Sequence, residues 1–339
     1  MNKPTIALTL GDPAGIGPEL IAKLLNTPNL TDHANIVVIG DTWLWQQGQK
    51  IAGVQINTRL IDCLADARQY QNEQQILLVS VDTIMPEEVT LGVATSSGGS
   101  SVLQVLDLCL KAVSKRDIDA ICFAPLNKQA MKLSGMKFED ELHFFADALG
   151  VKGFFCEFNT LGDLWTSRIS SHVPLKDITQ YLSKDRIKES TRLIYQSLKA
   201  AGYEHPRVAV AAFNPHGGEG GACGREEIDI IEPAISEMNA EGLPVSGPFP
   251  ADTIFLKARD GEYDAIVTMY HDQGQIAIKL LGFERGVTVQ GGLPVPITTP
   301  AHGTAYDIAG QNKANVTASE QAFYIACRMG KNYRAQAAQ

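Results

Sequence analysis

Short apolar runs alternate with helical patterns along the first part of this 339-residue chain. The runs long enough for a buried strand are Thr5–Leu10, Ile36–Ile39, Ile76–Val81 and Asp119–Ala124. Helical patterns over Leu20–Leu25 and Val102–Ser114 lie between them. Buried strands joined by helices are typical of a parallel sheet. The sequence therefore predicts an α/β fold, and its length predicts two lobes because one hydrophobic core rarely spans so many residues.

Three further apolar runs, in the second half of the chain, each lead to a histidine. These histidines are His172, His216 and His271. In α/β sheets ligands bind at the carboxyl ends of the strands, and imidazole is the commonest ligand for first-row metals. One histidine alone would simply be a polar loop residue. Three at strand ends predict one metal site that is assembled by folding, since catalytic sites typically use three protein ligands.

Other polar groups accompany these histidines. Asp272 directly follows His271, and Lys279 comes seven residues after Asp272. Asp252 lies in the proline-containing stretch Pro248–Phe255, which predicts a rigid turn. The simpler interpretations are a turn or cap role for Asp252 and a solvated surface position for Lys279.

Composition excludes several classes of function. The net charge is −9, with 38 acidic and 29 basic residues and no basic run, so nucleic acid and anionic membranes are not expected partners. The six cysteines include no Cys-x-x-Cys pair, which favours reduced thiols in a cytoplasmic protein. The start of the chain lacks the apolar core of a signal peptide, and no run is long enough to span a bilayer.

Five sequence blocks, in order, resemble the signature blocks of the 4-hydroxythreonine-4-phosphate dehydrogenase family. They are Gly11–Glu19, Asn214–Gly221, Pro250–Thr253, Met269–Gly274 and His302–Ala305. The resemblance implies the two-lobed α/β fold of isocitrate and isopropylmalate dehydrogenases, with a cleft between the lobes, in a homodimer. It places a cofactor-binding lobe at residues 1–130 plus 285–339, and a metal, substrate and dimerisation lobe at 131–284.

The resemblance also implies the chemistry, which is oxidation of a secondary alcohol by NAD or NADP with a divalent metal such as zinc, magnesium, manganese or cobalt. The metal ligands would be His172, His216 and His271, at sites shared between two subunits. The catalytic residues would be Asp252, Asp272 and Lys279, of which Lys279 would also contact the acidic end of the substrate. A bound metal can stabilise the alkoxide, and it can also stabilise the enolate if decarboxylation follows.

The cofactor segment is His302–Gly310 together with Asn315, which also resembles the adenosine-binding segment of isopropylmalate dehydrogenase. The resemblance implies cofactor binding by His302, Gly303, Thr304, Asp307 and Asn315. Glycine lets the backbone approach a planar base. An acidic side chain at position 307 would accept from the ribose 2′-hydroxyl and repel a 2′-phosphate, so we expect NAD rather than NADP.

The chain departs from the family at the positions that bind the substrate's phosphate. Glu141 and Leu142 replace a histidine and a threonine, Thr288 replaces an asparagine, and Ile297 replaces an arginine. Losing an arginine removes the strongest phosphate partner. We therefore expect these four positions to bind a substrate end that is not a phosphate, whereas Lys279 would bind the acidic end. A capping role for Glu141 at a helix start is the alternative.

The leading hypothesis is a metal- and NAD-dependent dehydrogenase of a hydroxy acid. Alternatives are the vitamin B6 pathway enzyme itself, with phosphate bound by His143 or Lys137, and a dehydrogenase of aromatic cis-dihydrodiol dicarboxylates of the terephthalate type. A third alternative is a metal- and nucleotide-binding protein without turnover, against which the retained histidines and carboxylates argue.

Overall fold

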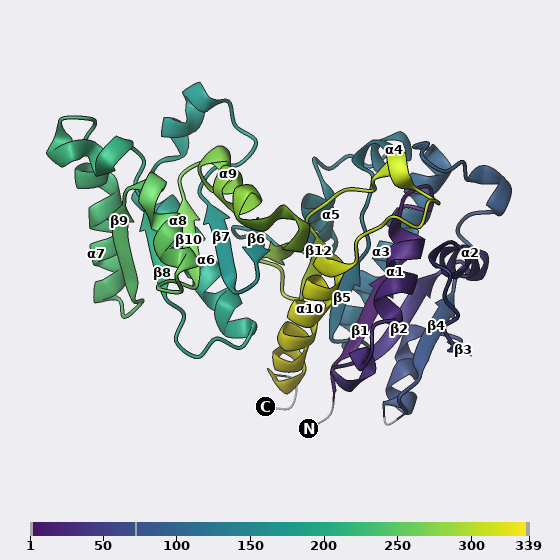
Figure 1. Ribbon diagram of the computed structural model, residues 1–339. Coiled ribbons are helices and arrows are strands. Elements are labelled where there is room, and N and C mark those ends of the chain that lie inside the picture. Colours follow the sequence, from purple (N-terminus) through teal and green to yellow (C-terminus); the bar gives the residue numbers. More distant parts are fainter. Residues whose placement is uncertain (1–2, 72, 337–339) are drawn as a thin grey trace. The chain divides into compact units, whose positions relative to one another are not determined.

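The computed structural model describes residues 3–71 and 73–336, and the chain divides into two compact units (Figure 1). The first unit comprises Met1–Lys152, Val287–Val289 and Leu293–Gln339, and the second comprises Gly153–Gly286 and Gln290–Gly292. Residues 131–152, which the sequence interpretation assigned to the second lobe, belong to the first unit. The reason is that Met131, Met136 and Phe145 are buried in its hydrophobic core.

The sheet of the first unit consists of parallel strands in the order β3-β4-β2-β1-β5-β12. Their bounds are β1 Thr5–Thr9, β2 Asn35–Gly40, β3 Thr58–Ile61, β4 Ile76–Ser80, β5 Ala120–Phe123 and β12 Ile297–Pro300. The strand β11, Gly286–Gly291, runs antiparallel to β12. Strands β1, β2 and β5 are buried along their whole length, as the continuous apolar runs indicated. Strand β12, which the sequence did not predict, is also buried along its whole length. The predicted α/β fold class is confirmed.

The helices of the first unit are α1 Gly17–Leu25, α2 Thr42–Ala52, α3 Ser96–Ser114, α4 Lys128–Leu133, α5 Glu141–Ala148 and α10 Thr317–Gln336. Helix α3 begins before the predicted Val102. The Thr95 hydroxyl caps it by accepting from the Gly98 N–H at 3.0 Å. A Cβ on Gly99 would lie 2.0 Å from the Ala130 carbonyl oxygen, so only glycine allows α3 to pack against α4 here.

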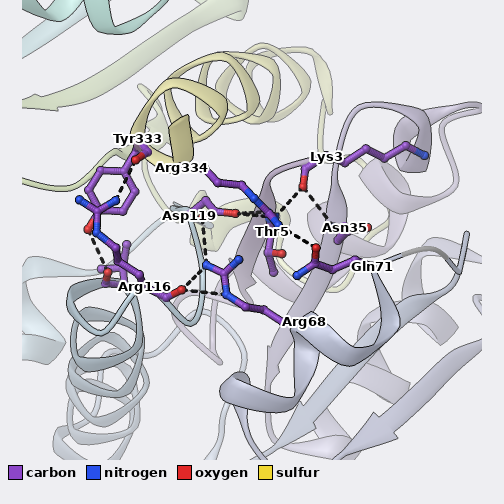
Figure 2. A network of polar contacts seen from close by, with 10 residues as sticks. Lys3, Thr5, Asn35, Arg68, Gln71, Arg116, Asp119, Tyr333 and Arg334 are labelled. Carbon is purple, nitrogen blue, oxygen red and sulfur yellow. Dashed lines mark hydrogen bonds and ion pairs between the residues drawn. The ribbon is translucent and has the colours of Figure 1, made fainter. Parts of the chain in front are cut away.

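A buried carboxylate fixes α10 to the amino end of this sheet (Figure 2). Asp119 accepts hydrogen bonds from the Thr5 N–H at 2.8 Å and from Arg68 at 3.2 Å. Arg334, in α10, lies 3.5 Å from the same carboxylate and donates to the Gln71 side chain at 2.8 Å. Because Asp119 is paired with two guanidinium groups, its burial is compensated.

The strands of the second unit follow one another in the order β6-β7-β10-β8-β9. The bounds are β6 Cys156–Leu161, β7 Leu164–Arg168, β8 Val208–Ala211, β9 Val245–Phe249 and β10 Ala265–Thr268. Only β6 runs antiparallel to its neighbour in this order. The helices are α6 Lys184–Ala200, α7 Glu232–Ala240, α8 Ala251–Arg259 and α9 His271–Gly282. Ile254, Ile266 and Ile278 belong to a core that joins α8, β10 and α9.

Within residues 3–71 and 73–336, no helix is both long enough and apolar enough to cross a membrane.

Candidate functional site

Four neighbouring strands of the second unit bring polar side chains to one edge of their sheet. Strands β7, β10, β8 and β9 are paired in this order, and all pairs are parallel. The carboxyl ends of parallel strands lie at the same edge. The residues that follow these four strands are His172, His271, His216 and Asp252, respectively. The topology therefore places all four at one edge, which the strand-end pattern in the sequence indicated for the three histidines but not for Asp252.

His172 and His271 lie side by side, with ring centroids 6.1 Å apart. An ion bound about 2.1 Å from an imidazole nitrogen lies about 3.3 Å from the ring centroid, so two rings on one ion are at most about 6.6 Å apart. The observed separation falls within that limit. These two residues can therefore bind the same metal ion.

A carboxylate orients the second of these rings. The Nδ1 atom of His271 lies 2.7 Å from Oδ1 of Asp272, at the start of α9. Histidines that ligate metals commonly donate their other ring nitrogen to a carboxylate, which fixes the tautomer and raises ligand basicity. This arrangement would leave Nε2 of His271 to ligate a metal. It places Asp272 where its carboxylate can orient the His271 ring.

His216 lies on a left-handed turn that follows β8. The residues from His216 to Gly220 all have positive φ, between 47° and 79°. Two of them, His216 and Glu219, are not glycine, and this conformation is unfavourable for residues with a side chain. The His216 side chain is 73 % exposed, and its Nδ1 lies 3.7 Å from the Glu219 carboxylate. The turn thus holds an accessible imidazole at the edge that carries His172 and His271.

Hydrogen bonds link the segments that carry the three histidines. The Ser170 hydroxyl, near His172, donates to the Met269 carbonyl oxygen at 2.8 Å. The Gln273 side chain accepts from the Met269 N–H and donates to the Ala212 carbonyl oxygen, both at 2.8 Å. Sequence reasoning missed Ser170 and Gln273, because their partners are backbone groups that only the fold brings near.

Asp252 lies in the first turn of α8 rather than in the predicted rigid turn. The Ile254 N–H donates to the Pro250 carbonyl oxygen at 3.1 Å, so the helix begins directly after the proline. The side chain of Asp252 is exposed, and so is that of Lys279 in the last turn of α9. Asp272 and Lys279 lie on one face of α9, about 10 Å apart along its axis, since the seven positions between them make almost two turns.

In the first unit, the predicted cofactor segment packs on the glycine-rich turn. The Thr304 carbonyl oxygen accepts from the Ile16 N–H at 3.0 Å, and the Tyr306 hydroxyl donates to Asp12 at 3.0 Å. A Cβ on Gly15 would lie 2.9 Å from the Cβ of Thr304, so glycine is required there. Two motifs from opposite ends of the chain therefore form one structural element.

The contact between Asp12 and Tyr306 is partly buried, and the pKa values of both groups are shifted. Burial raises the pKa of the Asp12 carboxyl, and hydrogen bonds from the Ala14 N–H and from Tyr306 only partly offset this effect. Burial, together with the charge of Asp12, raises the pKa of the Tyr306 hydroxyl. The pair therefore serves to hold the two motifs together.

The predicted cofactor residues leave polar groups and space for a ligand. Gly303, Asp307 and Asn315 are exposed, whereas Thr304 is buried. A Cβ on Gly303 would meet nothing within 4 Å. The Nε2 atom of His302 is shielded from solvent and has no hydrogen-bond partner in the described part of the chain. An unsatisfied nitrogen beside open space fits a bound nucleotide.

The predicted substrate positions divide into buried and accessible ones. Ile297 is fully buried in β12, and Leu142 and Thr288 are nearly so. These three residues would therefore affect a ligand because each replaces a polar residue of the family, and not through contacts of their own with the ligand. Glu141, the first residue of α5, is half-buried.

The helix cap beside Glu141 carries a second carboxylate. Asp140 accepts from the His143 N–H at 3.0 Å and lies 2.6 Å from the His143 Nδ1 atom. Burial raises the pKa of Asp140, but these hydrogen bonds and the charges of His143 and Lys128 outweigh it, so the pKa lies below its usual value. The start of α5 is therefore acidic at neutral pH.

Comparison with known proteins gives one consistent family. Residues 32–326 match the family model described as "Pyridoxal phosphate biosynthetic protein PdxA". The chain is 50 % identical to the Pseudomonas aeruginosa protein named "Putative 4-hydroxythreonine-4-phosphate dehydrogenase 2", over 97 % of this chain and 98 % of that protein. It is 38 % identical to the D-threonate 4-phosphate dehydrogenase of Salmonella typhimurium, over 93 % of this chain and 95 % of that protein.

Solved structures agree with these relatives. The 4-hydroxythreonine-4-phosphate dehydrogenase of Klebsiella pneumoniae has a TM-score of 0.84 and 33 % identity, over 97 % of this chain and 98 % of its own. The terephthalate 1,2-cis-dihydrodiol dehydrogenase of Burkholderia xenovorans has a TM-score of 0.64 and 27 % identity, over 93 % and 98 % of the two chains.

Proposed function

This chain belongs to the PdxA family, whose named relatives are dehydrogenases, and we propose that it oxidises the secondary alcohol of a hydroxy acid with NAD as hydride acceptor and a divalent metal at its histidines. The observation that carries this proposal is the pair His172 and His271, 6.1 Å apart, with the Asp272 carboxylate on the second ring. In this proposal the first unit binds the cofactor and the second binds the metal.

The metal would be held by His172, His216 and His271, and when bound it would stabilise negative charge on the substrate oxygen. Asp272 keeps His271 oriented for ligation. Asp252, exposed at the same sheet edge, would hold the reacting hydroxyl and accept its proton as the hydride leaves for the nicotinamide. Lys279 would bind the carboxylate of the substrate.

The exposed carboxylate of Asp307 would determine the choice between NAD and NADP. It would accept a hydrogen bond from the ribose 2′-hydroxyl of NAD and repel the 2′-phosphate of NADP. His302 and Gly303 would contact the adenosine, because an unsatisfied ring nitrogen and open space lie there.

The residues that would bind the far end of the substrate form the second determinant of specificity. The names of the P. aeruginosa and S. typhimurium relatives favour a phosphorylated substrate, so use of 4-hydroxythreonine 4-phosphate or a similar compound is the alternative function. In this chain, however, the arginine position is the fully buried Ile297, and the start of α5 carries Asp140 and Glu141. Asp140 is paired with His143, so the added negative charge that would repel a phosphate is that of Glu141. We therefore infer a substrate with a hydroxyl or cationic group at that end.

Self-association belongs to the proposal as well. Helix α9 exposes two large apolar side chains, Ile276 at 59 % and Leu280 at 84 %. They are four positions apart, so they lie on one helix face together with Asp272 and Lys279. Apolar side chains grouped beside a candidate site favour a protein partner. A homodimer in which this face of α9 is covered would bring a second subunit to the metal site.

The experiment that tests the function is an assay of NADH absorbance with purified protein, NAD, divalent metals and matched phosphorylated and unphosphorylated hydroxy acids. We expect NADH formation that stops after chelation and returns when metal is added. No NADH with any substrate, despite bound metal and nucleotide, would instead indicate a binding protein without turnover.

A further inference from the structure

We propose that Glu227 is a positioning residue that holds the left-handed turn in the form that presents His216 to the metal, an inference that rests on the proposed function. Glu227 begins a short helical segment, Glu227–Ile231, that precedes α7. It is only 1 % exposed. Its carboxylate faces the segment that leads from β8 to His216.

One carboxylate oxygen of Glu227 holds the entry to the turn. Oε1 accepts from the Phe213 N–H at 2.8 Å and from the Asn214 N–H at 2.7 Å. Oε2 accepts from the Asn214 side-chain amide at 2.9 Å. A buried ionised carboxylate forms strong, directional bonds with amide donors. These bonds fix the backbone two residues before His216.

The same carboxylate lies against the far side of the turn. A Cβ on Gly218 would be 2.7 Å from Oε2 of Glu227, and Gly218 has a φ of +79°. A Cβ on Gly224 would be 2.4 Å from the Asn214 amide nitrogen. The two glycines therefore allow the turn to close around the carboxylate.

This closure explains how an unfavourable backbone persists at a candidate ligand. His216 and Glu219 are not glycine, yet both have the left-handed backbone conformation with positive φ. Such residues keep that conformation only where the surrounding structure imposes it. The Glu227 carboxylate supplies bonds on the entry side and a steric limit on the return side. Without these restraints we expect the turn to relax and the imidazole of His216 to lose its fixed position at this edge of the sheet.

Titration with Co²⁺ tests this inference, because the visible absorption of bound cobalt depends on the number and kind of its ligands. The variants are Glu227→Gln, which replaces one acceptor oxygen with a donor amide, and His216→Ala, which removes the ligand itself. We expect Glu227→Gln to bind cobalt about 10–100-fold more weakly than the native protein. Losses of this size are typical when a residue that supports a metal ligand is replaced. Its cobalt spectrum should resemble that of His216→Ala.

A matched control separates positioning from general stability. Asp119→Asn alters an equally buried carboxylate in the first unit, so it should lower the unfolding temperature without changing the cobalt spectrum. If Glu227→Gln does not fold, Gly218→Ala tests the same contact, since its methyl group would displace the carboxylate.

The outcomes distinguish this inference from the proposed function. Native cobalt affinity and a native spectrum in Glu227→Gln, or in Gly218→Ala where that variant is used, would overturn the positioning role while leaving the metal site intact. If the native protein binds no cobalt, the metal site itself is wrong, and the inference falls with it.

Discussion

The ring centroids of His172 and His271 lie 6.1 Å apart, although the two residues follow different strands, β7 and β10. Parallel pairing of these strands, with Thr268 opposite Arg168, brings their carboxyl ends into register. The Ser170 hydroxyl then joins the two following segments through the Met269 carbonyl oxygen. The sheet and this hydrogen bond thus bring the two segments that carry His172 and His271 close together.

Replacing Asp272 by asparagine should weaken metal binding without abolishing it. The variant keeps all three imidazoles but loses the charged acceptor at His271 Nδ1, and such a loss typically reduces metal affinity about 10–100-fold. Competition with a metal chelator measures the change. Asp260→Asn, which removes an exposed carboxylate at the end of α8, is the control and should keep the native affinity. An unchanged affinity in Asp272→Asn would show that Asp272 does not support the ligand.

NAD should be preferred to NADP, and Asp307→Ser should reduce that preference. The substitution removes a negative charge that would face the 2′-phosphate, so kcat/KM with NADP should rise and kcat/KM with NAD should fall. Steady-state kinetics with both cofactors measures the ratio. Asp62→Ser, at another exposed acidic position in the first unit, provides the charge-matched control. Equal specificity constants in the native protein would remove the role assigned to Asp307.

The substrate end is tested most cleanly at Glu141, because Ile297→Arg would bury a charge in the core of β12. Glu141→His removes one negative charge and adds a donor at the start of α5. One charge-assisted hydrogen bond of about 1.5 kcal/mol should raise kcat/KM for a phosphorylated hydroxy acid about tenfold relative to its unphosphorylated analogue.

The control for Glu141→His is Asp147→His, which makes the same charge change near the other end of α5. Efficient use of the phosphorylated compound by the native protein, with no gain in Glu141→His, would show that phosphate is bound by other residues.

The helix cap at Asp140 should contribute stability that depends on pH. Its pKa is lowered on folding, so the folded state favours the ionised form. That contribution is present above the ordinary carboxyl pKa and is lost as the pH falls through the lower pKa of the folded state. Asp140→Ala should lower the free energy of unfolding by about 1 kcal/mol at pH 7, as for a lost helix cap.

Urea unfolding of the native protein and Asp140→Ala at pH 7 and at successively lower pH measures this difference. The gap between the two proteins should narrow as acid protonates Asp140. A constant gap at all pH values would mean that the charge of Asp140 contributes nothing.

The sequence predicted β1, β2, β4 and β5 to within about one residue at each end, since continuous apolar runs report burial on both faces directly. It did not predict the buried strands β11 and β12, whose threonine, glutamine and proline residues interrupt the apolar pattern. It did not predict the first turns of α3, where serine and glycine have low helix propensity and packing of Gly99 on Ala130 decides the outcome. It placed Asp252 in a turn for a similar reason, because proline signals both turns and helix starts. Glu227 and Gln273 left no signal, since their partners are backbone amides and carbonyls.

The most direct test of the central claim is elemental analysis of the purified native protein and of His172→Ala, His216→Ala and His271→Ala, with His205→Ala, an exposed histidine before β8, as control. We expect one divalent metal per chain in the native protein and in the control. Each of the three ligand variants should lose most of that metal and its NADH-forming activity while keeping native circular dichroism. Full metal occupancy in all three variants would contradict the site.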